Sequence, residues 1–179
     1  MVKWMKKVLS FFFILTFALP GFAHAEGDTR IITDGYGRTV EIPTTVETIA
    51  ATSFTARILV YAGVTDMLVG VTDMDKTGDA SMPYSALNKD LFNALPSVGA
   101  GGSGDVTDYE ALVMLGPDVI FCNKDAETAR DIQDKIGIPA VGLSYSGIFD
   151  QSVYDSLALV GEVTGAYERC AAVIEALKG

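Results

Sequence analysis

The alternation of short apolar runs with helical stretches constrains the fold of this chain more than any other feature of its sequence. Four runs have the composition of buried strands: 48–51, 67–71, 119–122 and 140–142. Four stretches have helical periodicity: 55–62, 107–115, 127–136 and 151–163. Strands that alternate with helices are typical of a parallel sheet covered on both faces. The sequence therefore predicts an α/β fold with a doubly wound, mostly parallel sheet.

Further elements are expected before, between and after these. The runs 31–33 and 39–42 flank Asp34-Gly35-Tyr36-Gly37, whose glycines permit the positive φ of a tight turn, so we expect an N-terminal β-hairpin. Residues 72–96 are rich in loop-forming residues, with a short helix near 90–93. Asp150 is expected to cap the helix at 151–163. The last helical pattern, 166–177, carries an apolar stripe of Ala171, Ile174 and Leu177.

The first 25 residues have the pattern of a secretory leader. Lys3, Lys6 and Lys7 precede an apolar run at 8–19, and Ala23-His24-Ala25 supplies small residues for cleavage. A helix that spans a membrane needs about 20 apolar residues, and this run is shorter. We therefore predict a cleaved signal peptide at 1–25 and a periplasmic or secreted protein without a membrane anchor. No cysteine lies near the cut, so the chain is not expected to be a lipoprotein.

Charge and residue usage narrow the function classes. Removal of the leader lowers the basic residues from 13 to 10 against 23 acidic ones, which gives a net charge of −13. Such a chain is repelled by nucleic acid. Its one histidine, His24, also leaves, which argues against a zinc site or a histidine-dependent nucleophile. Cys122 and Cys170 are expected to be core residues, although a disulfide between them stays possible. We expect a monomer with no metal site, no cofactor and no catalytic residues.

Candidate binding residues follow from the rule that ligands collect beyond the carboxyl ends of the strands in a doubly wound sheet. Three loops of this chain lie at such ends, and two further loops contribute an aromatic residue and glycine-rich backbone. The candidates are Ser53, Phe54, Thr55, Arg57, Tyr84, Gly102, Ser103, Asn123, Lys124 and Tyr145.

Several candidates have a plainer structural interpretation. Ser53 can be only a helix N-cap, Arg57 can extend to water, and Tyr84 can be a surface loop residue. Asn123 and Lys124 can belong to a solvated loop. The glycines at 99–104 match the dinucleotide pattern G-x-G-x-x-G, but the preceding strand is short and the next helix begins after the third glycine. We expect a flexible loop lining a cleft, or a simple connector.

Six segments carry a family resemblance in their order along the chain. The first is Ile32-Thr33-Asp34-Gly35-Tyr36-Gly37-Arg38-Thr39-Val40-Glu41-Ile42-Pro43, which is similar to an opening hairpin of the form TDxxGRxVxIP. The other five are 48–63 with Met67-Leu68-Val69-Gly70-Val71-Thr72, Pro83-Tyr84, Pro96-Ser97-Val98-Gly99, Asp108-Tyr109-Glu110-Ala111-Leu112 and Leu115-Gly116-Pro117-Asp118-Val119-Ile120. Together they resemble the iron-complex and cobalamin class of periplasmic binding proteins of ABC importers, whose two lobes are joined by one long helix.

The resemblance implies a domain organisation and a function. Residues 26–164 would form the N-terminal lobe and 165–179 the start of the interlobe helix, with the C-terminal lobe absent. The chain would capture an iron chelate of the siderophore type and deliver it to an ABC permease. Cobalamin, haem and molybdate or tungstate are alternative ligands. The resemblance also implies that Glu110 docks onto permease arginines, while Thr107 and Glu110 have the spacing of a capping box.

Two other classes of function stay open at this point. A secreted α/β enzyme would need a nucleophile with a base, or a metal cluster, and we identify neither in residues 26–179. A truncated fragment without a function of its own is the second alternative.

Overall fold

The computed structural model describes residues 28–102, 106–146 and 149–179. The predicted signal peptide at 1–25 and the candidate Ser103 therefore lie outside the described residues. Within these ranges, no helix is both long enough and apolar enough to cross a membrane.

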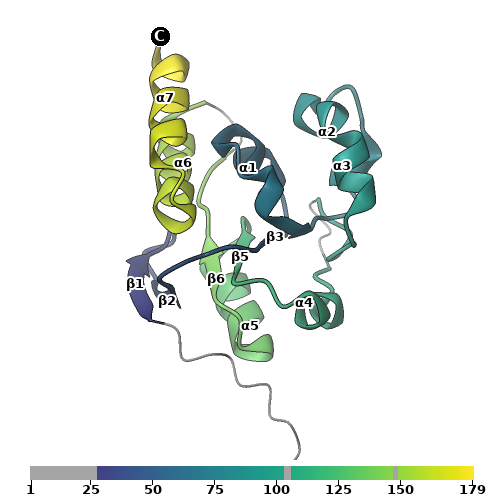
Figure 1. Ribbon diagram of the computed structural model, residues 1–179, viewed down its shortest axis with the longest axis vertical. Helices are drawn as coiled ribbons and strands as arrows, with labels where there is room; N and C mark the ends of the chain where they lie inside the picture. Colours follow the sequence, from purple (N-terminus) through teal and green to yellow (C-terminus); the bar gives the residue numbers. More distant parts are fainter. Residues whose placement is uncertain (1–27, 103–105, 147–148) are drawn as a thin grey trace, which may run out of the picture.

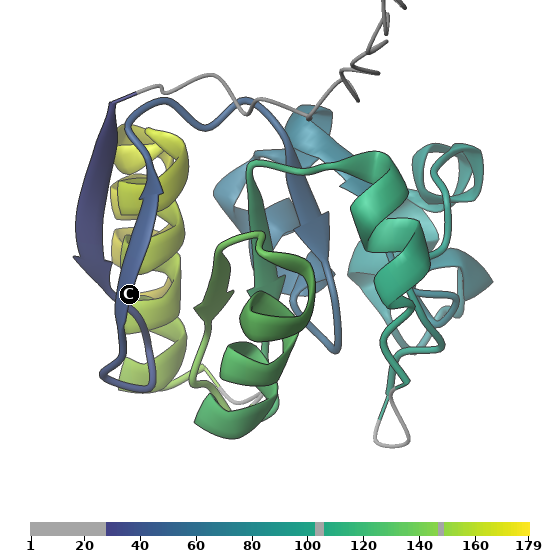
Figure 2. The ribbon, with the colours of Figure 1, turned by 90° about the horizontal axis from the view of Figure 1, so that it is seen from below.

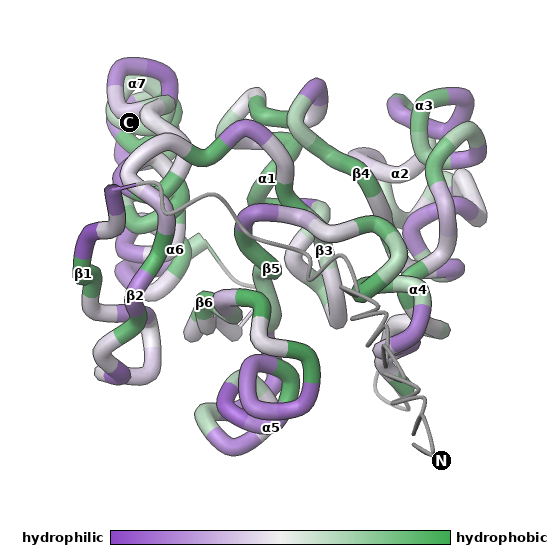
Figure 3. Tube along the Cα trace, turned by 60° about the horizontal axis from the view of Figure 1, so that its bottom comes forward, coloured by the Kyte–Doolittle hydropathy of each residue, from purple (hydrophilic) through white to green (hydrophobic). Residues whose placement is uncertain are grey.

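Four short strands form a parallel sheet in the order β4-β3-β5-β6; β3, β5 and β6 are labelled in Figure 1, and all four are labelled in Figure 3. They are β3 (Ile49–Ala51), β4 (Leu68–Gly70), β5 (Val119–Cys122) and β6 (Ala140–Gly142). Every pairing between them is parallel, with Ile49 opposite Val119 and Phe121 opposite Val141. The predicted doubly wound parallel sheet is thereby confirmed.

Both faces of this sheet are buried, because successive strand residues point to opposite sides. Ile49, Ala51 and Phe121 pack with α1 (Ala56–Ala62), α6 (Gln151–Thr164) and α7 (Tyr167–Lys178). Ala50, Ile120 and Cys122 pack with α4 (Tyr109–Leu115) and α5 (Ala126–Ile136) on the other face. The two helical layers are visible on either side of the strands in Figure 2. In Figure 3, β5 is hydrophobic along its length, whereas α5 carries many hydrophilic residues.

The predicted hairpin forms a separate antiparallel sheet from β1 (Thr29–Thr33) and β2 (Thr39–Pro43). Its turn places Gly37 at φ 76°, as a tight turn requires. Asp34 is buried and accepts hydrogen bonds from the backbone N–H groups of Tyr36 and Arg38. The Arg38 guanidinium forms an ion pair of 3.0 Å with the same carboxylate. These bonds fix the turn that carries the hairpin against the main sheet.

The segment after β4 differs from its predicted loop. It contains η2 (Asp75–Thr77), α2 (Pro83–Leu87) and α3 (Lys89–Ala94), and a further short 3-10 helix, η1 (Thr65–Met67), precedes β4. Buried Phe92 and Ser85 hold these turns in place. The helix α3 confirms the short helix expected near 90–93, whereas η2 and α2 are too short to show a complete hydrophobic period and were not predicted.

The predicted apolar stripe of the last helix is confirmed at Ile174 and Leu177 and is wrong at Ala171. Cys170 is buried, and Val173, Ile174 and Leu177 pack against the core, whereas Ala171 is exposed. Cys122 and Cys170 are buried in core clusters on opposite faces of the sheet, and no disulfide joins them.

Candidate functional site

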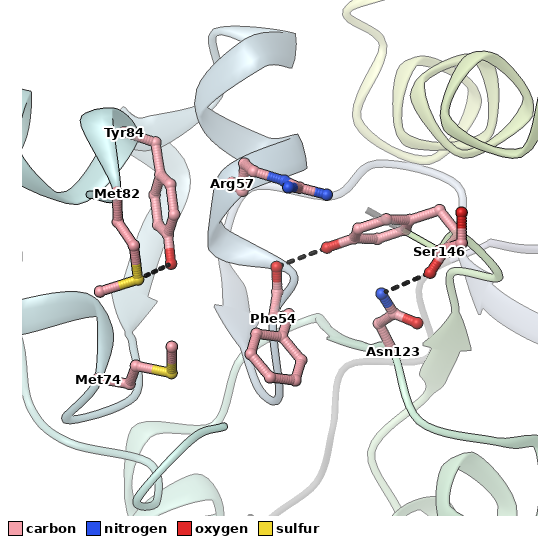
Figure 4. A pocket seen from close by; sticks show the side chains of 8 residues that line it. Phe54, Arg57, Met74, Met82, Tyr84, Asn123 and Ser146 are labelled. Carbon is pink, nitrogen blue, oxygen red and sulfur yellow. Dashed lines mark hydrogen bonds between the residues drawn. The ribbon is translucent and has the colours of Figure 1, made fainter. Parts of the chain in front are cut away.

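A pocket of about 460 Å³ opens at the carboxyl ends of the strands. The chain passes from β3 outward to β4 and then returns to β5 on the other side, so β3 and β5 flank the point where the strand order reverses. Ligands of doubly wound sheets bind at this point. Eight residues line the pocket (Figure 4): Phe54, Arg57, Met74, Met82, Tyr84, Asn123, Tyr145 and Ser146.

The turn after β3 contains one residue that lines the pocket and two buried residues that do not. Ser53 adopts the left-handed conformation with φ 57° and is buried. The next residue, Phe54, is 37% exposed and lines the pocket. Thr55 is fully buried, and its hydroxyl donates to the carbonyls of Thr52 and Phe121 at 2.8 and 3.2 Å. Ser53 is therefore not the N-cap of α1, since that position belongs to Thr55, and neither residue lines the pocket.

Arg57, Asn123 and Tyr145 connect three loops around the pocket. The guanidinium carbon of Arg57 lies 5.2 Å from the centre of the Tyr145 ring, a cation–π distance. The Tyr145 hydroxyl donates to the carbonyl of Phe54, and the Asn123 amide donates to the carbonyl of Tyr145 at 3.3 Å. Burial raises the pKa of the Tyr145 phenol, and Asn123, followed by the positive charge of Arg57, partly opposes that rise. The loops after β3, β5 and β6 thus form one side of the site.

Met74, Met82 and Tyr84 form the opposite side (Figure 4). Tyr84 is 8% exposed, and its hydroxyl donates to Oδ1 of Asp75 at 3.0 Å. The same hydroxyl lies 3.7 Å from the sulfur of Met82. Burial, followed by the negative charge of Asp75, raises the pKa of the Tyr84 phenol. The interpretation of Tyr84 as a surface loop residue is wrong, because it lies in α2 with its ring inside the molecule.

The remaining candidates lie beside this pocket or behind it. Lys124 lines a neighbouring cavity of about 470 Å³, which shares Asn123, Tyr145 and Ser146 with the first. Gly102 has φ 79° and lies behind Met74, where an added Cβ would be 3.3 Å from the Met74 sulfur. Of the ten candidates, the structure brings together Phe54, Arg57, Tyr84, Asn123 and Tyr145 at the main pocket.

Sequence reasoning missed Met74, Met82 and Ser146. Met74 follows β4 closely and Ser146 follows β6, so the rule of strand ends could have included both. Met82 lies in the segment that was predicted as loop, and no pattern distinguished it.

Glu110 is exposed in the first turn of α4. The N-cap of this helix is Asp108, whose Oδ1 accepts from the N–H of Ala111 at 2.9 Å. The predicted capping box with Thr107 as its first residue is therefore wrong. Because Asp108 already provides the cap, Glu110 is not needed for it.

Comparison with known proteins gives a family and a fold. Residues 49–179, from β3 onward, match the family model described as periplasmic binding protein. A periplasmic solute binding protein from Veillonella parvula has a similar structure, with a TM-score of 0.68, 24% identity, and coverage of 84% of this chain and 45% of that chain. Comparison with curated protein sequences gives no match.

Two further solved structures are similar. The molybdate periplasmic binding protein MolA of Haemophilus influenzae has a TM-score of 0.66 and 23% identity over 82% of this chain and 50% of that chain. A protein of an ABC-type Fe3+-hydroxamate transport system from Saccharomonospora viridis has a TM-score of 0.60 and 21% identity, with coverage of 83% of this chain and 53% of that chain. The chain spans about half the length of these proteins, and at such identities the likeness shows the fold.

Proposed function

The chain belongs to the periplasmic binding protein family, and from this premise we propose that it is the solute-binding component of an ABC importer, capturing a ferric chelate for delivery to a permease. The family is one of solute-binding transport proteins, which favours this function over a secreted enzyme. The observation that carries the proposal is the pocket at the strand ends, where aromatic rings, thioethers and one guanidinium converge.

The lining of the pocket favours a ligand with apolar and aromatic surface. Phe54, Tyr84 and Tyr145 contribute rings, and Met74 and Met82 contribute polarisable thioethers. Aromatic rings pack well on planar groups, and methionine adapts to irregular apolar shapes. A bare oxyanion such as molybdate presents only oxygen atoms, which would leave most of this lining without a partner. The chelator in an iron complex of the siderophore type supplies apolar and aromatic surface.

The charge of the pocket favours an anion. Arg57 places a guanidinium among the lining residues of a chain that carries 23 acidic side chains in all. A guanidinium offers several donors in one plane to carboxylate or phenolate oxygens. The orientation of Arg57 over the Tyr145 ring holds this group at the pocket. We infer a chelate with net negative charge.

The pocket phenols favour a metal that arrives already coordinated. The hydroxyls of Tyr84 and Tyr145 both donate to oxygen atoms of the protein. Burial raises the pKa of each phenol, so both stay protonated near neutral pH. A protonated phenol is a poor ligand for ferric iron compared with a phenolate. The iron would thus be recognised through its chelator.

A titration of the chain with candidate ligands tests the proposal. The only tryptophan is Trp4, in the predicted leader, so the emission of the processed protein comes from tyrosines, two of which line the pocket. We expect a ferric siderophore-type chelate to quench this emission saturably and to release heat in calorimetry. The iron-free chelator, haem, cyanocobalamin, molybdate and zinc chloride are the comparison ligands. Tight binding of molybdate or zinc, with no binding of any ferric chelate, would overturn the assignment.

The partner and the location follow from the same proposal. We propose that Glu110, exposed at the start of α4, docks onto arginines of the permease. We also propose that the protein works in the periplasm after cleavage of residues 1–25, with 26–164 as an N-terminal lobe and an interlobe helix from 165. The family supports the periplasmic location.

A further inference from the structure

Asp75 is a buried carboxylate directly behind one wall of the pocket. The residue is 1% exposed, and it follows Met74 in the chain. Its Oδ2 accepts from the backbone N–H and the hydroxyl of Thr72 at 3.1 and 2.6 Å. Its Oδ1 accepts from the hydroxyl of Tyr84 at 3.0 Å. A buried carboxylate is costly unless it is well hydrogen-bonded, and these three donors offset that cost.

The backbone of Asp75 joins the same elements. Its N–H donates to the carbonyl of Thr72 at 3.1 Å. Its carbonyl accepts from the hydroxyl of Ser85 at 2.7 Å, and that hydroxyl in turn accepts from the N–H of Gly78 at 3.0 Å. The turn after β4 and the helix α2 are thus fastened to each other at this one residue.

The glycine-rich loop supports this arrangement from behind. The N–H of Met74 donates to the carbonyl of Ala100 at 3.1 Å. A Cβ on Gly101 would lie 2.4 Å from the Thr72 hydroxyl and 3.0 Å from Cβ of Met74, so only glycine fits there. This close contact restricts the Thr72 side chain, whose hydroxyl donates to Asp75. The loop therefore acts as packing behind the pocket wall.

We propose that Asp75 is a positioning residue that sets ligand selectivity, because it engages the Tyr84 hydroxyl behind the wall and leaves the Tyr84 ring and two thioethers to face the ligand. This inference rests on the proposed capture of a ferric chelate. A wall of this kind suits the aryl groups of a ferric catecholate better than the aliphatic, more polar surface of a ferric hydroxamate. Because the wall is held in place before the ligand arrives, its side chains lose less conformational entropy on binding.

The substitution Asp75→Asn would alter the hydrogen bonds of the wall while keeping the volume of the side chain nearly constant. Asparagine has one acceptor oxygen, whereas the carboxylate has two. If that oxygen accepts from Thr72, the amide N–H₂ faces Tyr84, whose hydroxyl then becomes an acceptor. The hydroxyl proton is released from Asp75 and can turn toward the Met82 sulfur, 3.7 Å away in the pocket wall, or toward the ligand. Asp75→Asn therefore exchanges an apolar wall for one that offers a hydrogen-bond donor.

The affinities of the chain for a ferric tris-catecholate and a ferric trihydroxamate test this inference. We expect the wild type to prefer the catecholate and Asp75→Asn to lower that preference about tenfold, since a new polar group in an apolar wall penalises the aryl ligand. Asp79→Asn is the matched control, because Asp79 is an exposed acid of the same segment. Its Oδ1 accepts a hydrogen bond from the backbone N–H of Ser81. The control should keep the preference. Equal losses of affinity for both chelates in Asp75→Asn would overturn the proposal.

Removal of the hydroxyl provides the decisive second variant. Tyr84→Phe keeps the ring, so it should keep the preference for the catecholate, and it should restore that preference when combined with Asp75→Asn. A folded Tyr84→Phe that loses the preference would show that the hydroxyl contacts the ligand, and the proposal would fail. This variant decides the question even if Asp75→Asn is too unstable to assay.

A measurement without ligand separates this inference from the proposed function. In ¹³C-tyrosine NMR spectra, the Tyr84 ring, assigned through Tyr84→Phe, should give distinct signals for its two sides in the wild type and averaged signals in Asp75→Asn. Identical ring signals in both would overturn the positioning role. A wild type that binds neither chelate would instead defeat the proposed function.

Discussion

Oδ2 of Asp34 accepts a hydrogen bond of 3.1 Å from the backbone N–H of Gly142, which lies 108 residues further along the chain. The N–H of Gly35 next to it donates to the carbonyl of Gly142 at 2.8 Å. This pair of bonds joins the N-terminal hairpin to β6, beside the loop that carries Tyr145. The hairpin is thereby connected to the frame of the pocket.

Replacement of Asp34 by alanine should strongly destabilise the protein. The change leaves the Arg38 guanidinium, which is only 10% exposed, without its carboxylate, and it removes the acceptor of the Gly142 N–H. Loss of one member of a buried ion pair costs about 3–5 kcal/mol. Chemical denaturation measures the effect. Asp66→Ala, at an exposed acid, should stay within about 0.5 kcal/mol of wild type. A comparable loss of stability in both variants would contradict the stabilising role of the Asp34 carboxylate.

Replacement of Gly142 by alanine should also lower the free energy of unfolding. A Cβ there would lie 2.2 Å from the Tyr36 ring and 2.9 Å from Oδ2 of Asp34. Crowding of this kind costs about 1–3 kcal/mol. If the ring is the cause, the same substitution should cost less in a Tyr36→Ala background, as a double-mutant cycle would measure. Additive effects would rule the contact out.

Arg57→Gln should weaken the binding of an anionic ferric chelate about tenfold, since hydrogen bonds to a charged group contribute about 1.5–3 kcal/mol. Binding should also become less sensitive to salt, because one attractive charge is lost. Calorimetry at two ionic strengths provides both quantities. Arg130→Gln, at an exposed position of α5, is the matched control. An equal change in the two variants would argue against a ligand contact of Arg57.

Glu110→Gln should leave folding and ligand affinity unchanged but weaken association with the permease. The cap of α4 is Asp108, so the substitution removes a charge without removing the cap. Loss of a charge at a complementary interface lowers association and its salt dependence. Binding to the permease in lipid discs, measured beside the melting temperature, tests this. Glu127→Gln, in the first turn of α5, is the control. Wild-type association by Glu110→Gln would refute the docking role.

Acid should destabilise α5 through its cap. The N–H of Thr128 donates to Asp125 at 2.6 Å, and this hydrogen bond lowers the pKa of the Asp125 carboxyl. A lowered folded-state pKa contributes stability above the ordinary carboxyl value that is lost as the pH falls below about 4. Asparagine caps without titrating, so Asp125→Asn should lose less melting temperature than wild type between pH 6 and pH 3. Equal losses would exclude this contribution.

Much of the frame could be predicted because it depends on local pattern. The run 119–122 contains only apolar residues, and it is a strand buried on both faces. Asp150 caps α6 as expected, with its side chain accepting from the N–H of Ser152. The strand-end rule also selected Phe54, Asn123 and Tyr145, which line one pocket. Each of these follows from periodicity, capping or chain direction, all of which are readable along the sequence.

Tyr84 was a candidate from the sequence, but only the tertiary structure showed that it forms a second wall of the pocket with Met74 and Met82 and which residues support that wall. Asp75 and Tyr84 lie nine residues apart in a segment whose short turns have no readable period, and their contact depends on how α2 packs on the turn after β4. The placement of Gly101 against Thr72 is likewise a contact between distant segments. The sequence by itself determined the order of strands and helices and the end of the sheet where ligands bind. Which side chains meet there depended on packing between segments, because burial and hydrogen bonding act across space and leave no periodic mark on the chain.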